Sequence, residues 1–401
     1  MMKRFASILV ACFCAALCLS AQPKTYNSYK GLVMAGYQGW FDTPEDGSGR
    51  GWYHYNRAGR FEPGYCTIDL WPDTSEYPVT YETAFRMEDG TPARIFSSQD
   101  PSTVDVHFRW MKEYGLDGVF MQRFVTEVTR PAGKLHFDKV LASAMDCANK
   151  YERAIAVMYD LSGMPSGGDE FLLKDIAEIA EKHALFDHSK NPSYLYHNGK
   201  PLVAVWGIGF NDNRKYGFRE AAVIINGLRK MGFSIMIGVP TRWRELTQDT
   251  ISDKELHRLI RKCDVVMPWF VGRYNPDSYA KFRSLIDDDI AFAKKLHVDY
   301  APLCFPGFSW DNMQKPGRRS SLIPRLGGAF LREQLDYCID AGAEMIYVAM
   351  FDEIDEGTAI FKLAKDIPVG QPGSTFVPLE DGVEPDTYLK IVGEAAARLK
   401  K

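Results

Sequence analysis

The stretch GVFMQRF at residues 118–124 has the character of a β-strand buried on both faces, and its surroundings decide the fold. Residues 104–114 before it and 137–151 after it have the apolar spacing of amphipathic helices. A second apolar run, residues 154–159, follows the second helix. Short apolar strands that alternate with helices indicate a parallel sheet covered by helices.

The same alternation extends over nearly the whole chain. Strands are expected at residues 32–40, 118–124, 154–159, 202–208, 234–239, 264–269, 300–305 and 344–351. Helices are expected at residues 104–114, 137–151, 171–183, 218–231, 254–262, 279–296, 328–341 and 385–399. Eight strand–helix repeats predict an α/β fold, a single (β/α)8 TIM barrel. The alternative is a doubly wound open sheet, but no GxGxxG motif follows the first strand.

The first strand-to-helix connection, residues 42–99, is far longer than usual for such a fold. A long loop at this end of a barrel often builds a wall of the binding site. The aromatic residues of the loop suit such a wall, and a bulky core would explain them equally well; they include Trp52, Tyr53, Tyr55, Phe61, Tyr65, Trp71 and Tyr77.

Composition excludes several classes of protein. The chain has 401 residues, 46% of them hydrophobic, which rules out global disorder. Its formal net charge of −4 argues against a nucleic-acid partner, because affinity for polyanions comes from a basic surface. The cysteines show no CxxC pair and no nearby histidine cluster, so neither a zinc site nor a disulfide framework is expected.

The N-terminus has the pattern of an export signal. Residues 1–4 are basic, residues 5–19 are apolar, and Leu19-Ser20-Ala21 has the small residues of a cleavage site. We expect residues 1–21 to be a secretory signal peptide and residues 22–401 to form one barrel domain. Cleavage before Cys12, as in a lipoprotein, is the alternative. No later segment is long and apolar enough to span a membrane, so the expected location is periplasmic, cell-surface or extracellular.

Chemistry in a TIM barrel lies where the strands end, because their C-terminal ends converge on one mouth. The strand ends of this chain carry aromatic, basic and polar residues that suit a sugar site. Aromatic faces stack on sugar rings, although each tryptophan could instead fill the barrel, and one of Tyr37 and Trp40 could be core. The candidate substrate-binding residues are Tyr37, Trp40, Gln122, Arg123, Tyr159, Asp160, Trp206, Arg242, Trp269 and Arg273.

The densest chemical feature is FDEIDEGT at residues 351–358, directly after the eighth strand. Four carboxylates in five residues repel one another, which raises some of their pKa values. Glu353 and Glu356 are three residues apart, so both can point into the mouth, and paired carboxylates are the machinery of glycoside hydrolysis. The alternatives are a solvated acidic turn and a metal-binding loop of a phosphoesterase, although no histidine ligands accompany the acids.

Residues 351–360, FDEIDEGTAI, resemble the signature of glycoside hydrolase family 99, which reads Phe-Asn-Glu-aromatic-x-Glu-Gly-Thr-x-Ile. The segment SSQDPS at residues 97–102, followed by His107 and Met111, is similar to that family's Ser-Ser-x-Asp-Pro-Ser segment and first helix. NPSY at 191–194 and GKPL at 199–202 are similar to its approach to strand four. The chain therefore resembles family 99 or the related 71/99-like group.

This resemblance implies a retaining (β/α)8 endo-α-mannosidase or α-mannanase that acts on an oligo- or polysaccharide without a metal or organic cofactor. Glu353 then matches the base that deprotonates the sugar 2-hydroxyl. Glu356 matches the general acid/base.

The subsites depart from the family pattern. The end of strand two reads MQRF at residues 121–124, where the mannosidases carry Trp-Tyr. Tyr159-Asp160 stands in place of a Glu-Pro-Tyr.

Two alternatives stay open. One is a barrel that binds carbohydrate but has lost catalysis. The other is a hydrolase for a non-mannan sugar, including an anionic one, because Arg123, Arg242 and Arg273 follow strand ends. Guanidinium groups bind carboxylates, sulfates and phosphates, but these arginines could instead pair with Asp160, Asp352 or Asp355.

Overall fold

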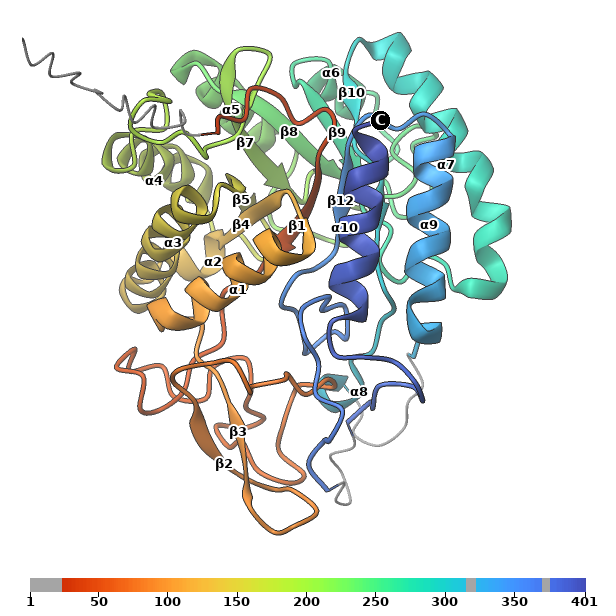
Figure 1. The fold of residues 1–401 in the computed structure, drawn as a ribbon. Coiled ribbons are helices and arrows are strands. Elements are labelled where there is room, and N and C mark those ends of the chain that lie inside the picture. The colour runs from red at the N-terminus through yellow and green to blue at the C-terminus, as the bar shows by residue number, and fades with distance from the viewer. Residues whose placement is uncertain (1–23, 315–321, 370–375) are drawn as a thin grey trace, which may run out of the picture.

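The computed structural model describes residues 24–314, 322–369 and 376–401 (Figure 1). The predicted signal segment at residues 1–21 lies outside these ranges. Each of the eight expected strands is present, the seventh in two pieces. The barrel strands are β1 (Val33–Tyr37), β4 (Gly118–Phe124), β5 (Ala154–Asp160), β7 (Lys200–Trp206), β8 (Ser234–Val239), β9 (Val265–Pro268), β10 (Asp299–Tyr300), β11 (Leu303–Cys304) and β12 (Ile346–Val348).

These strands form a parallel sheet in the order β10-β9-β8-β7-β5-β4-β1-β12-β11. Its two end strands are consecutive in the chain and are separated only by Ala301 and Pro302. Ala301 N–H donates to Val266 O at 2.9 Å, and Tyr347 N–H donates to Pro302 O at 3.0 Å. The segment from β10 to β11 is therefore the seventh strand, and it joins both edges of the sheet. The predicted (β/α)8 barrel is confirmed.

The expected helices surround this barrel, with boundaries that differ by a few residues (Figure 1). Gly115 and Gly232 cap two of them at φ of 84° and 97°, a left-handed conformation that glycine adopts without strain. The helices are α1 (Pro101–Tyr114), α2 (Val125–Val128), α3 (Pro131–Tyr151), α4 (Gly168–Lys182), α5 (Phe218–Met231), α6 (Glu255–Ile260), α7 (Pro276–Leu296), α8 (Asp311–Gln314), α9 (Ala329–Asp340) and α10 (Thr387–Leu399), with a 3-10 turn at Leu326–Gly328. Among the described residues, none of these helices has the length and apolar character needed to cross a membrane.

Strand register sets which side chains meet at the mouth. Asp160 at the end of β5 is level with Phe124 of β4 and with Trp206 of β7. Side chains alternate across a strand, so residues two apart share a face. Gln122 and Phe124 therefore lie on one face of β4, and the intervening Arg123 lies on the other.

The long first loop forms a lobe beyond the C-terminal ends of the strands (Figure 1). It contains an antiparallel hairpin, β2 (Tyr81–Arg86) with β3 (Pro92–Ile95). The N–H groups of Asp69 and Leu70 donate to Ile354 O, which fastens the lobe to the acidic turn. The remaining short strand, β6 (Tyr196–His197), pairs antiparallel with β7 outside the barrel.

Several aromatic residues of the lobe form a core rather than a binding wall. Tyr55, Phe61, Trp71 and Tyr77 are buried, and the rings of Tyr55 and Phe61 lie 5.1 Å apart. The buried apolar side chains offset the conformational entropy that a loop of this length loses when it is ordered.

Candidate active site

The acidic turn is fixed to the end of the first strand. Asp352 accepts hydrogen bonds from the backbone N–H groups of Gln38 at 2.7 Å and Gly39 at 2.9 Å. Phe351 N–H donates to Gly36 O at 2.7 Å. These contacts cross the seam between β12 and β1 and orient the turn. Burial raises the pKa of Asp352 to about 7, and the two N–H donors oppose this shift.

Glu353 is buried and held at both carboxyl oxygens. Gln38 Nε2 donates to Oε1, and Thr358 Oγ1 donates to Oε2. Burial, followed by the nearby Glu356 and Asp355, raises the pKa of Glu353 well above its usual range, and the two hydrogen bonds offset only part of this rise. The two fixed donors stabilise the carboxylate form relative to the same buried site without them, and this is the form that can act as a base.

Glu356 has a different environment. Its carboxyl group accepts no hydrogen bond from the described residues, and its side chain is partly exposed. Burial, followed by the charges of Asp355 and Asp160, raises its pKa to about 8. A carboxyl group with this pKa keeps its proton at neutral pH and can act as a general acid.

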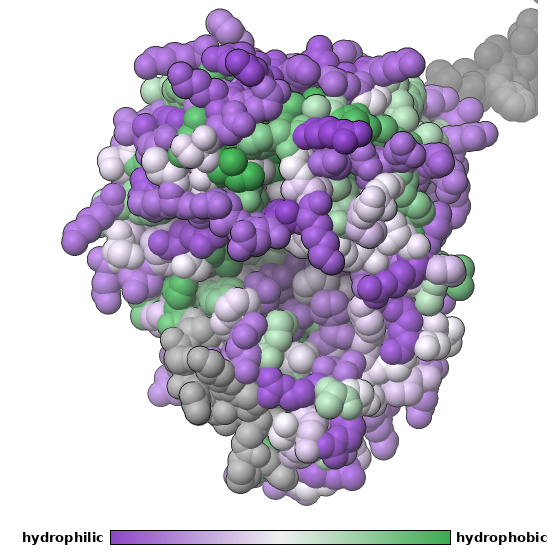
Figure 2. Space-filling view, turned by 180° about the vertical axis from the view of Figure 1, so that it is seen from behind, coloured by the Kyte–Doolittle hydropathy of each residue, from purple (hydrophilic) through white to green (hydrophobic). Residues whose placement is uncertain are grey.

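Both glutamates line one cavity of about 330 Å³ at the C-terminal mouth of the barrel, which we call the cleft. This volume lies at the lower end of the range for small-molecule sites. Figure 2 shows a mostly hydrophilic face with a hollow near its middle. The cleft is lined by Gln38, Trp40, Gln122, Phe124, Met158, Asp160, Ser162, Trp206, Trp269, Met350, Glu353 and Glu356.

The tryptophans stand on different strands around the cleft. Trp40 follows β1, whereas Trp206 and Trp269 lie at the ends of β7 and β9 with ring centroids 5.1 Å apart. Space for Trp206 depends on Gly238 of β8, since a Cβ there would lie 2.5 Å from Trp206 Cδ1. The cleft thus has aromatic surfaces from separated strands, with carboxyl groups contributed by other strands.

Several buried polar atoms of the lining residues lack hydrogen-bond partners among the described residues. They are two acceptors, Gln38 Oε1 and Gln122 Oε1, and two donors, Trp40 Nε1 and Trp206 Nε1. Leaving a buried polar group unpaired costs about 1–3 kcal/mol. Hydroxyl groups both donate and accept, so a polyhydroxylated ligand suits such a mixed set.

The structure places seven predicted residues in the cleft, namely Glu353, Glu356, Trp40, Gln122, Asp160, Trp206 and Trp269. The other five predicted residues, Tyr37, Arg123, Tyr159, Arg242 and Arg273, do not line it.

Tyr37 lies behind the barrel wall, so the expectation that it lines the cleft is wrong. Its hydroxyl is 2.8 Å from His107 Nδ1, and Tyr77 contacts His107 Nε2 at 2.6 Å. The residue is fully buried. Gln38, one position later, faces the other way, as alternation along a strand requires.

The prediction that Arg123 and Tyr159 line the cleft is also wrong, because both side chains face the helices. They are paired in the register of β4 and β5 and both point to Asp175 on α4. The Arg123 guanidinium contacts Asp175 at 2.8 and 2.7 Å, and Tyr159 Oη donates to the same carboxylate at 2.6 Å. Asp138 on α3 pairs with Arg123 at 2.9 Å. The cluster joins the sheet to two helices and is structural.

Arg242 and Arg273 line a separate cavity of about 300 Å³. Arg242 pairs with Glu245, and Arg273 pairs with Asp249, each at 3.4 Å. All three arginines that suggested an anionic sugar therefore have carboxylate partners in the protein. Those partners are not Asp160, Asp352 or Asp355, which were the partners expected from the sequence.

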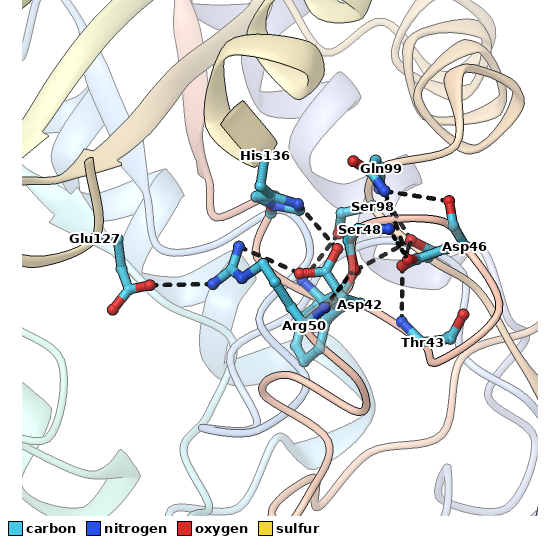
Figure 3. A network of polar contacts seen from close by, with 12 residues as sticks. Asp42, Thr43, Asp46, Ser48, Arg50, Ser98, Gln99, Glu127 and His136 are labelled. Atoms are coloured by element: carbon cyan, nitrogen blue, oxygen red, sulfur yellow. Dashed lines mark hydrogen bonds and ion pairs between the residues drawn. The ribbon is translucent and has the colours of Figure 1, made fainter. Parts of the chain in front are cut away.

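The sequence interpretation missed two histidines that hold Trp40 and the adjacent backbone in place. His54 stacks on Trp40 with centroids 3.8 Å apart and rings 5° from parallel. His136 Nε2 contacts Gly39 O at 2.7 Å. Neither residue stands at a strand end, which was the signal used. Figure 3 shows the polar network that includes His136, in which Arg50 links Asp42 and Glu127 and His136 contacts Asp42.

Two other observations bear on the chemistry of the site. In the described part of the chain, no group of three His, Cys, Asp or Glu residues is arranged to hold a metal ion. The floor of the cleft lies against Gly36 of β1, where a Cβ would collide with Met350 and with Tyr347 Oη. The small residue leaves room for these larger side chains at the bottom of the site.

Comparison with known proteins identifies solved structures that share this fold. No protein-family model matches the sequence, and no curated protein matches it. Among solved structures, the GH99 endo-α-mannosidase from Bacteroides thetaiotaomicron is similar with a TM-score of 0.64 at 15% identity, in two structures. The likeness covers 94% of this chain and 98% of that one when BIS-TRIS-propane is bound there, and 92% and 98% in the other structure.

A "glycoside hydrolase-like protein" is similar with a TM-score of 0.54 at 14% identity, over 83% of this chain and 96% of that one. Over nearly its whole length, this chain has the fold of the family 99 structures.

Proposed function

We propose that this protein is a glycoside hydrolase that cleaves an α-linked glycan with retention of anomeric configuration. The observation that carries the proposal is the contrast between two carboxyl groups in one cleft. Glu353 has a hydrogen-bond donor at each oxygen, and Glu356 has none and a pKa raised to about 8. One group is prepared to accept a proton and the other to give one.

In the first step, Glu353 takes the proton of the sugar 2-hydroxyl, and that oxygen attacks the anomeric carbon. The glycosidic bond breaks as Glu356 donates its proton to the leaving oxygen. The product of this step is an epoxide-like sugar. In the second step, Glu356 takes a proton from water, water attacks the anomeric carbon, and Glu353 returns its proton to the 2-oxygen. Both carboxyl groups end in their starting states.

The lining of the cleft supports a carbohydrate substrate. Trp40, Trp206 and Trp269 offer flat apolar surfaces of the kind that stack on sugar rings. The unpaired amide oxygens and indole N–H groups suit hydroxyl groups. The residues expected to give mannan specificity differ from the family pattern, so the proposal names an α-linked glycan and leaves its sugar to experiment.

The experiment is a screen of plant, yeast and host α-glycans with purified protein, in which NMR follows the anomer first released. The proposal expects products whose first-formed anomer is α, and no release with Glu356→Gln. A first-formed β-anomer would contradict retention. Glycan binding without cleavage by the native protein would favour a barrel that binds carbohydrate only.

We also propose that the protein is exported, because residues 5–19 are apolar and precede the small residues Ser20 and Ala21. Mass spectrometry of the protein from its native host tests this. Cleavage after Ala21 is expected, and a lipid-modified Cys12 at the mature N-terminus would favour the lipoprotein alternative.

A further inference from the structure

A histidine from the first loop reaches the acidic turn. His54 Nδ1 lies 3.1 Å from Asp355 Oδ2, and Asp355 is fully buried. The position of His54 is fixed on both sides, because its ring stacks on Trp40 and its carbonyl accepts from Thr67 Oγ1 at 2.6 Å. Asp355 stands between Glu353 and Glu356 in the sequence, and neither step of the proposed reaction uses it.

Asp355 and Glu356 are neighbouring carboxyl groups with unequal surroundings, the first fully buried and the second partly exposed. Burial raises the pKa of each to about 8. The backbone N–H groups of Asp355 and Glu356 act on the Asp355 carboxyl and lower its pKa. No donor among the described residues acts on the Glu356 carboxyl, and Asp355 and Asp160 raise its pKa. A proton shared by the pair is therefore better placed on Glu356.

His54 further favours ionisation of Asp355 over ionisation of Glu356, and it does so without adding a charge. Burial and the positive charge of Arg50 lower its pKa to about 3, so its ring is neutral. A neutral imidazole carries one N–H, and donation from Nδ1 stabilises an ionised Asp355. The charged groups around His54 are Arg50, Glu127, Asp42 and His136, and those around the carboxyl pair are Asp160, Asp352 and Glu353.

We propose that His54 is a positioning residue that keeps Asp355 ionised by a hydrogen bond from Nδ1 and thereby leaves the shared proton on Glu356. This inference rests on the role proposed above for Glu356 as the acid. It assigns to the first loop a part in the chemistry besides building a lobe. Because the same ring stacks on Trp40, His54 contacts both an aromatic residue of the cleft and an acid of the turn.

Two substitutions separate the hydrogen bond from the stacking. His54→Phe keeps a ring against Trp40 and removes the donor. His54→Asn loses the ring, but its amide N–H can occupy the place of Nδ1. His197→Phe is the control, because His197 forms a similar pair with Asp299, with Nε2 2.9 Å from the carboxylate, at the opposite end of the barrel. Thermal unfolding first confirms that all three variants are folded.

The first readout needs no substrate. Carboxyl groups are labelled with carbon-13, and NMR follows the titration of Glu356, assigned by its loss in Glu356→Gln. The proposal expects its pKa to fall by about one unit or more in His54→Phe and to stay near the native value in His54→Asn and His197→Phe. An unchanged pKa in His54→Phe, or an equal fall in His54→Asn, would overturn it. Because no turnover is involved, this result stands even if the proposed hydrolase activity is absent.

The second readout uses the glycan found by the screen and an aryl glycoside with an activated leaving group, which needs no protonation. In His54→Phe the glycan should be cleaved ~100-fold more slowly, and the aryl glycoside should lose less than about threefold. His54→Asn should restore most of the glycan cleavage. Equal losses on both substrates would show that His54 supports the site only structurally and would contradict the proposal.

Discussion

The side chain of Gln38, one residue beyond β1, donates a hydrogen bond to Glu353, which follows β12. The first and last barrel strands thus meet at a catalytic carboxylate in the proposed mechanism. The backbone N–H of Gln38 also donates to Asp352, so this one residue holds two acids of the turn. The contacts between the ends of β1 and β12 therefore both close the barrel and position the acids of the site.

Removing the Gln38 side chain should weaken the base. In Gln38→Leu the Glu353 carboxylate loses a donor in a buried site, and its pKa rises further. We expect turnover at saturating substrate to fall between about 10- and 100-fold, with the pH optimum displaced upward. Thr358→Val, which removes the donor at the other oxygen, should act in the same direction. Unchanged turnover and pH profile in both variants would separate Glu353 from the chemistry.

Neighbouring residues at the end of β5 should behave differently when changed. Tyr159→Phe removes a hydrogen bond to the buried Asp175 and should cost about 1–3 kcal/mol in free energy of unfolding. Its activity should stay within about twofold of native, because Tyr159 faces the helices. Asp160→Asn removes a carboxylate from the cleft and should change KM and the alkaline limb of the pH profile. Urea unfolding and steady-state kinetics on both variants test this contrast.

Trp206 should contribute to binding of the substrate. Trp206→Ala removes a stacking surface, and KM should rise by ~10-fold, since contacts of an aromatic ring contribute about 0.5–1.5 kcal/mol beyond the burial of area. Trp243→Phe is the control, because Trp243 is buried outside the cleft and donates from Nε1 to Asp289 at 2.9 Å. It should lower stability and leave KM unchanged. A KM for Trp206→Ala equal to that of the native protein would remove Trp206 from the binding surface.

Stability should fall as the solution becomes alkaline. Burial raises the pKa of Asp69 to about 6, of Asp352 and Asp289 to about 7, and of Glu356 to about 8. The folded protein therefore keeps protons that the unfolded chain loses above pH ~4, and the associated stability disappears as pH rises through 6 to 8. Acids with lowered pKa, such as Glu76, act below this window.

The measurement is the free energy of unfolding in urea at pH 5 and pH 8.5. The value at pH 5 should be the larger, and Asp352→Asn should reduce the difference, because an amide has no proton to lose. A stability that is equal or greater at pH 8.5 would show that these acids are ionised in the folded protein.

The fold was predictable because each barrel strand is a continuous apolar run, and such runs mark strands buried on both faces. The acidic turn was predictable because it directly follows the last of these runs. The direction of individual side chains was harder to infer. Reading Tyr37, Arg123 and Tyr159 as cleft residues treated every strand end as facing inward, although alternate residues face the helices.

The support of the cleft could not be inferred from the sequence. His54 and Asp355 are 301 positions apart in the chain, and His54 lies in a loop without a strand or helix pattern. Only the folding of the lobe over the turn brings them together. The separate cavity with Arg242 and Arg273 has the same origin, because the loops after β8 and β9 determine which way those arginines turn.

The most direct test of the central claim compares Glu353→Gln and Glu356→Gln with the native protein on the glycan from the screen. Calorimetry measures binding, and NMR measures product. The account predicts that both variants fold, bind the glycan within about threefold of native affinity, and lose at least ~1000-fold in turnover. Near-native turnover in either variant would contradict the assignment of these two carboxyl groups as the catalytic pair.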